Sequence, residues 1–83
     1  GLVNEVVPDG GLDEAIAALA APIIAASRRV VAIGKRAFWS QLHRPLEEAY
    51  AEMAETMSRN AVDPAAREGI GAFLEKRTPI WPH

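Results

Sequence analysis

The spacing of apolar residues along the chain predicts a mainly helical protein. Leu12, Ile16, Leu19 and Ile23 recur at i, i+4, i+7 and i+11, which places them on one stripe of a first helix over residues 12–26. Pro22 lies inside this segment, where it removes one backbone hydrogen bond and clashes with the preceding turn. We therefore expect a kink over residues 18–22, or a helix that ends there and begins again.

Two further helices follow in the middle of the chain. Ser27 can cap a second helix that runs to about Leu42, and Pro45 can occupy the first position of a third. The third helix has the clearest apolar pattern, made of Leu46, Ala49, Tyr50, Met53 and Met57. Its tyrosine and two methionines are predicted to be core residues, and Asn60 is predicted to be the left-handed residue that ends the helix.

A fourth helix begins at Asp63, whose side chain can accept from first-turn N–H groups, and continues through Pro64 at the next position. Its apolar face contains Ala66, Ile70, Phe73 and Leu74, and Phe73 is predicted to belong to the core. Gly69 and Gly71 lie inside the helix, where each costs about 1 kcal/mol relative to alanine. They indicate either a loose helix or the close approach of a neighbour that this chain does not itself contain.

The N-terminal residues favour a strand rather than a helix. Val3, Val6 and Val7 predict a short strand over residues 2–7, and residues 8–11 supply a turn. An arm without any sheet is the alternative. One strand is not stable alone, so we expect neighbouring strands outside this sequence. The predicted organisation is a strand and turn at 1–10 that leave a missing α/β core, followed by a helical domain of three to four helices at 11–83.

Composition and charge narrow the function classes. The chain has 83 residues, a net charge of −2 and no cysteine. This predicts one small domain without disulfides and no basic surface of the kind that binds nucleic acid. No apolar run reaches the roughly 20 residues of a membrane span. The lack of cysteine fits a reducing compartment, and we predict the cytoplasm, with the mitochondrial matrix as the alternative.

No residue pattern points to catalysis or to a metal. His43 and His83 lack neighbours at metal-ligand spacing, no serine has the context of a nucleophile, and the glutamates of the third helix lie on an exposed face. Basic residues repeat seven apart along the second helix, which indicates a solvated face or an anion contact: Arg28, Arg29, Lys35 and Arg36. We therefore predict no catalytic residue and no metal ligand in this chain.

Several motifs, in order, resemble the enoyl-CoA hydratase/isomerase (crotonase) family. The resemblance covers nearly the whole chain: GLVNEVVP at residues 1–8, GKRAF at 34–38, and EGI, AFLEKR and Pro79 at 68–79. Details at residues 38–42, 49–50, 57, 60 and 79–83 are similar to one subgroup of that family. The resemblance implies that this chain is the C-terminal helical, oligomerisation region that follows a spiral α/β core.

The resemblance also implies a function. Family members act on acyl-CoA thioesters as trimers or dimers of trimers, and they stabilise an enolate with core groups that would lie upstream of Gly1. By position, Lys76 corresponds to a lysine that approaches the phosphate-bearing adenosine end of coenzyme A, often on a neighbouring subunit. Met57 stands where typical hydratases carry an aromatic residue against the adenine.

This chain would then serve assembly and complete the coenzyme A site without catalysing on its own. The alternative for Lys76 is a solvated partner of the helix dipole. For the whole chain, the alternatives are a non-enzymatic homologue of the family and a stand-alone helical interaction module.

Overall fold

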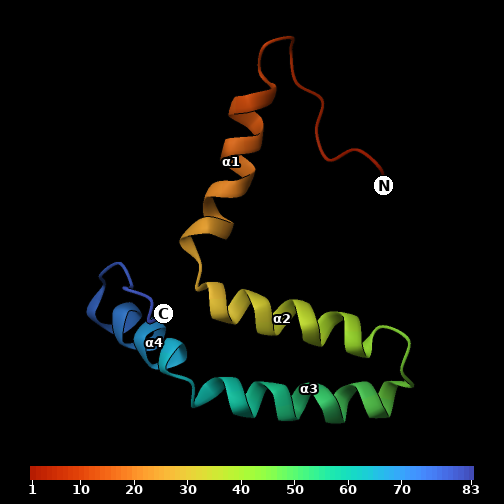
Figure 1. Cartoon of the computed structure of the whole chain (residues 1–83), viewed down its shortest axis with the longest axis vertical. Helices are drawn as coiled ribbons and strands as arrows, with labels where there is room; N and C mark the ends of the chain where they lie inside the picture. Colours follow the sequence, from red (N-terminus) through yellow and green to blue (C-terminus); the bar gives the residue numbers. More distant parts are fainter.

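A computed structural model describes all residues 1–83 and contains four helices and no strand (Figure 1). These are α1 (Leu12–Ala25), α2 (Arg28–Gln41), α3 (Leu46–Ala61) and α4 (Pro64–Glu75). The predicted helical class and the four predicted helices are confirmed. The predicted strand at residues 2–7 is wrong for this chain. Residues 1–8 form an extended arm, because no other segment offers a partner for their backbone groups.

Helix α1 runs through Pro22 and ends three residues later. Of the two predicted outcomes, a kink or an ending at the proline, the ending is therefore wrong. The chain becomes extended at Ala26, and Ser27 then begins α2 by accepting a hydrogen bond from the Val30 N–H at 3.4 Å. Helices α1 and α2 meet at an angle of 99°. The Ser27 cap is confirmed, and the serine itself is buried at this corner.

Helices α2 and α3 form an antiparallel pair, which α4 joins at the far end of α3 (Figure 1). Pro45 is the residue that precedes α3 rather than its first helical residue. The prediction for Asn60 is wrong: this residue lies within α3, which ends at Ala61 and is followed by Val62 in a right-handed conformation. No left-handed residue is needed there, because the Asp63 N–H donates to the Asn60 carbonyl at 3.1 Å and the chain turns directly into α4.

The buried residues are small. Only Ser27, Ala49, Asp63, Ala65 and Ala72 are buried. On α4 the inward face thus contains alanines, with Gly69 between them, while the larger apolar side chains point outward. The predicted core residues Tyr50, Met57 and Phe73 are 70%, 67% and 82% exposed, so that prediction is wrong within this chain.

The molecule is far more open than a self-contained domain. Its radius of gyration is 16.7 Å, whereas a compact domain of this length would have about 12 Å. Its accessible surface is 7334 Å², against roughly 4,800 Å² for a folded monomer of this mass. Helix α1 adds to both the radius of gyration and the accessible surface, because it stands away from the other three helices (Figure 1).

None of the helices has by itself the length and apolar character needed to cross a membrane. Helices α1 and α2 satisfy those two criteria only when taken together as a bent pair.

Candidate functional site

The end of α4 carries the first candidate residue, Lys76. Its backbone is left-handed, with φ 53° and ψ 42°, and it is the only residue other than glycine with a positive φ. The turn is held by two backbone hydrogen bonds, from the Lys76 N–H to the Phe73 carbonyl at 3.3 Å and from the Arg77 N–H to the Ala72 carbonyl at 3.0 Å. The Lys76 side chain is exposed and makes no ion pair.

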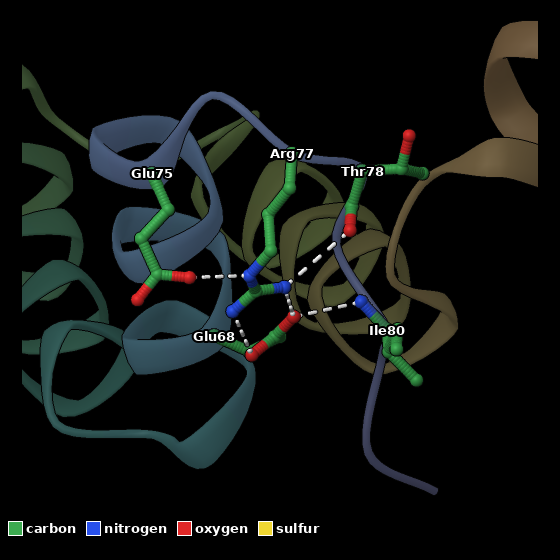
Figure 2. Close-up of polar contacts among 5 residues, drawn as sticks. All are labelled: Glu68, Glu75, Arg77, Thr78 and Ile80. Carbon is green, nitrogen blue, oxygen red and sulfur yellow. Dashed lines mark hydrogen bonds and ion pairs between the residues drawn. The ribbon is translucent and has the colours of Figure 1, made fainter.

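Arg77 organises the residues around this turn (Figure 2). Its guanidinium donates to both carboxylate oxygens of Glu68, at 2.6 and 3.2 Å, and to Glu75 Oε2 at 2.5 Å. Glu68 Oε1 also accepts from the Ile80 N–H at 2.7 Å. Glu68 on α4 therefore binds two residues that follow Lys76, the Arg77 side chain and the Ile80 backbone, and these contacts connect the helix to the tail.

These contacts change the titration of both groups. Hydrogen bonds from Arg77 and from the Ile80 N–H lower the pKa of Glu68 to about 2. The two carboxylates raise the pKa of Arg77 further above its ordinary value. Glu68 and Arg77 are therefore both charged at neutral pH.

The tail then packs back on the helices through Trp81. The Trp81 indole N–H donates to the Ala25 carbonyl at 2.8 Å. Its ring lies over Gly69, where a Cβ atom would be only 3.3 Å from Cη2 and Cζ3. The close neighbour predicted at Gly69 thus exists, but it belongs to this chain, so the expectation of an external neighbour is wrong at this position. At Gly71 a Cβ would lie 3.9 Å from Arg77 Nη2, an ordinary contact.

Met57, the second candidate residue, lies on α3 beside a groove between α2 and α3. The groove has a volume of about 500 Å³, and its apolar lining includes Val30, Ile33, Phe38, Met53 and Met57. Lys76 does not line this groove. The structure therefore places the two candidates on different elements and does not bring them together within one chain.

The basic residues of α2 divide into two kinds. Arg29 donates to Asp63 Oδ2 at 2.6 Å, while Asp63 Oδ1 accepts from the Ala65 N–H at 2.9 Å and caps α4. The Ala65 N–H and Arg29 lower the pKa of Asp63. Arg36 lines a second cavity between α2 and α3, of about 350 Å³, together with Ser40, Glu52 and Arg59. Neither of the two histidines takes part in a group that could hold a metal ion.

Sequence reasoning overlooked the roles of Glu68, Arg77 and Trp81. All three lie within segments that the motifs cover, but the sequence pattern predicts the helix and the extended tail as separate elements. A possible signal was the spacing of nine residues between Glu68 and Arg77, which becomes a contact only if the chain reverses at the helix end.

Comparison with known proteins gives a consistent result. The family model described as enoyl-CoA hydratase/isomerase matches residues 1–83. Enoyl-CoA hydratase domain-containing protein 3, mitochondrial, is 41% identical over all 83 residues in both Rattus norvegicus and Homo sapiens. This is the subgroup that residues 38–42, 49–50 and 79–83 indicate. The chain spans 28% and 27% of the length of these two relatives.

Solved structures agree in fold. An enoyl-CoA hydratase from Mycobacterium smegmatis superposes with a TM-score of 0.89 at 48% identity, over 98% of this chain and 32% of that one. Human enoyl-CoA hydratase domain-containing protein 3 gives a TM-score of 0.90 at 41% identity with the same coverage. The match of the whole chain to the family model, together with these relatives, shows that this chain belongs to the enoyl-CoA hydratase/isomerase family.

Proposed function

We propose that this chain is the C-terminal helical region of a protein that hydrates or isomerises enoyl-CoA thioesters. In this proposal residues 1–10 lead out of an α/β core, and residues 11–83 cover that core and join neighbouring subunits. The chain itself supplies assembly and part of the coenzyme A site, and no catalytic residue. The family acts on acyl-CoA thioesters and is typically trimeric, which supports this reading.

The observation that carries the proposal is the uncovered surface. The chain exposes 7334 Å², about 2,500 Å² more than the roughly 4,800 Å² expected for a monomer of this size. An excess of this size equals that of a large protein–protein interface. It is what a helical layer should show when it is separated from the partners that it covers.

The exposed apolar residues lie on more than one face, which favours more than one neighbour. On α1, Leu12, Ile16, Leu19 and Ile23 are each at least 55% exposed and share one stripe. On α3, Leu46, Tyr50 and Met57 are each at least 67% exposed. Contiguous apolar patches of this kind mark interaction sites. We assign one to the chain's own α/β core and the other to a second subunit.

The coenzyme A contacts are the second part of the proposal. The Lys76 ammonium is exposed and unpaired, so it can meet a phosphate as a mobile point charge. Met57 can pack against an adenine but cannot stack on it as an aromatic ring would. Since the two residues do not meet within one chain, they would serve coenzyme A molecules on different subunits, or different parts of one site at an interface.

The test uses the full-length protein. We expect sedimentation to give a trimer or a dimer of trimers, and the double variant Tyr50→Glu, Met57→Glu to dissociate or to lose its fold. Glu55→Lys changes charge on the polar side of the same helix and should leave the mass unchanged. A monomeric wild-type protein at high micromolar concentration would contradict the assembly role. Enoyl-CoA turnover by the 83-residue chain alone, above the protein-free blank, would contradict the assignment of catalysis to the core.

The compartment is a further part of the proposal. The curated relatives carry the word mitochondrial in their names, whereas the Mycobacterium smegmatis enzyme comes from a bacterium. We propose the cytoplasm, with the mitochondrial matrix as the alternative. Fractionation of cells that express the full-length protein distinguishes the two.

A further inference from the structure

The unusual feature at the end of α4 is a lysine in a backbone conformation that normally selects glycine. The left-handed region costs a residue with a Cβ roughly 1–2 kcal/mol, and helices most often end there with glycine. Lys76 occupies this region with φ 53°. Strain of this kind persists only where the surrounding structure over-determines it, and it clusters at functional sites.

The surroundings of Lys76 do over-determine the turn. Arg77 holds Glu68 from one side, at 2.6 and 3.2 Å, and Glu75 from the other, at 2.5 Å (Figure 2). Glu68 in turn accepts from the Ile80 N–H at 2.7 Å, which closes the reversal of the chain. Lys76 stands between Glu75 and Arg77 in the sequence, so its backbone is fixed at both ends.

Arg77 also controls the charge near the lysine. Glu68 and Glu75 are the carboxylates that line the turn, and both are bound to Arg77 rather than to Lys76. Without the guanidinium, the two carboxylates would lack a counter-charge, so they would attract the Lys76 ammonium and repel an anionic ligand. With it, Lys76 makes no ion pair and keeps its charge available.

We propose that Arg77 is a positioning residue for Lys76: it occupies the carboxylates of Glu68 and Glu75 and holds the left-handed turn that presents the free ammonium to a ligand phosphate. This inference rests on the proposed function, in which Lys76 meets the phosphate-bearing adenosine end of coenzyme A. It adds the residue that keeps Lys76 unpaired and the two carboxylates that would otherwise compete for it.

The test measures binding of coenzyme A and of dephospho-coenzyme A, which lacks the 3′-phosphate, to the full-length protein by calorimetry. The dissociation constant of dephospho-coenzyme A divided by that of coenzyme A measures how much the 3′-phosphate contributes to binding. We call this quotient the ratio. Binding of dephospho-coenzyme A alone controls for general loss of the site. We expect Lys76→Ala to weaken coenzyme A binding about fivefold, as for one exposed charge contact, and to leave dephospho-coenzyme A unchanged.

Arg77→Gln should reduce the ratio as Lys76→Ala does, although the lysine is still present. The triple variant Glu68→Gln, Glu75→Gln, Arg77→Gln removes the competing carboxylates together with the arginine, and it should restore at least half of the lost ratio. A purely structural role predicts no such recovery. Arg59→Gln breaks an arginine–glutamate pair on α3 with Glu55 and is the matched control, with an expected ratio equal to wild type.

Lys76→Gly provides a second test that does not depend on those variants folding equally well. Glycine removes the backbone strain, so the unfolding temperature should rise while the ratio falls as for Lys76→Ala. The two possible failures differ. If the ratio falls in Lys76→Ala but equals wild type in Arg77→Gln, the positioning role is overturned and the proposed function stands. If Lys76→Ala and Lys76→Gly both keep the ratio, the phosphate contact itself is overturned.

Discussion

The indole ring of Trp81 lies directly over Gly69, so closely that a Cβ atom at that glycine would be 3.3 Å from two ring carbons. The same indole donates its N–H to the Ala25 carbonyl at 2.8 Å. One side chain of the tail thus connects the middle of α4 to the last residue of α1. The contact explains why a glycine stands inside α4, and it makes the two glycines of that helix different in kind.

The two glycines of α4 should respond differently to alanine. Gly71→Ala meets only Arg77 Nη2 at 3.9 Å, so it should raise the free energy of unfolding by about 0.5–1 kcal/mol through helix propensity. Gly69→Ala must displace the Trp81 ring, so it should raise the free energy of unfolding by less than Gly71→Ala does, or lower it. In a Trp81→Ala background the two substitutions should give equal gains. Thermal unfolding of the full-length variants by circular dichroism measures this, and equal gains in the wild-type background would contradict it.

Trp81→Phe should remove the hydrogen bond to Ala25, because phenylalanine has no N–H donor, and it also shortens the ring that lies over Gly69. We expect a loss of about 0.5–1.5 kcal/mol and faster hydrogen exchange in the last turn of α1. Trp39→Phe is the matched control, since Trp39 is 67% exposed and donates no hydrogen bond. Unchanged exchange at residues 23–26 in Trp81→Phe would mean that the tail does not restrain α1.

The pH dependence of tail docking should follow Glu68. Its pKa is lowered from 4.5 to about 2 by Arg77 and by the Ile80 N–H. The folded state therefore binds fewer protons than the unfolded state between these values, and the contribution to stability is complete above about pH 4.5 and lost as pH falls through about 2. Trp81 fluorescence, in a Trp39→Phe background, should be constant from pH 7 to 4.5 and change below it.

Glu68→Gln provides the comparison for that titration. Glutamine keeps an oxygen that can accept from the Ile80 N–H, but it has no charge to titrate. The fluorescence of this variant should show a smaller change between pH 4.5 and 2 than wild type. An equal change in both proteins would assign the acid transition to another group.

Asp63 should be more important to stability than its partner Arg29, because it has two roles. Asp63→Ala removes both the cap on the Ala65 N–H and the ion pair. Asp63→Asn keeps an oxygen for the cap, and Arg29→Ala removes only the pair. The unfolding temperature should therefore fall most for Asp63→Ala and less, by similar amounts, for the other two. A loss in Asp63→Asn as large as in Asp63→Ala would show that the cap contributes nothing.

The local elements follow from the sequence because their causes are local. Ser27 and Asp63 are caps whose side chains accept from N–H groups two or three residues away. The apolar residues of α3 recur at the spacing of a helix, so the sequence alone predicts that element. The family motifs are equally readable, since they are strings of neighbouring residues. These signals predicted four helices, their approximate ends and the family.

Burial and contacts between distant segments were decided only in three dimensions. Tyr50, Met57 and Phe73 read as core because they are apolar at helical spacing, but spacing says only that residues share a face and not that this chain covers it. The buried residues of α4 are the small Ala65 and Ala72. Gly69 lies between them, and its lack of a side chain lets the Trp81 ring approach.

The strand at residues 2–7 failed for the same reason, because a ladder needs a second backbone. The pairing of Glu68 with Arg77 depended on a reversal at Lys76 that no local preference of lysine predicts. The sequence by itself thus determined the helices and the family. Only the tertiary structure decided that Arg77 takes up the carboxylates and leaves Lys76 free, because that outcome depends on which side chains the turn brings within reach.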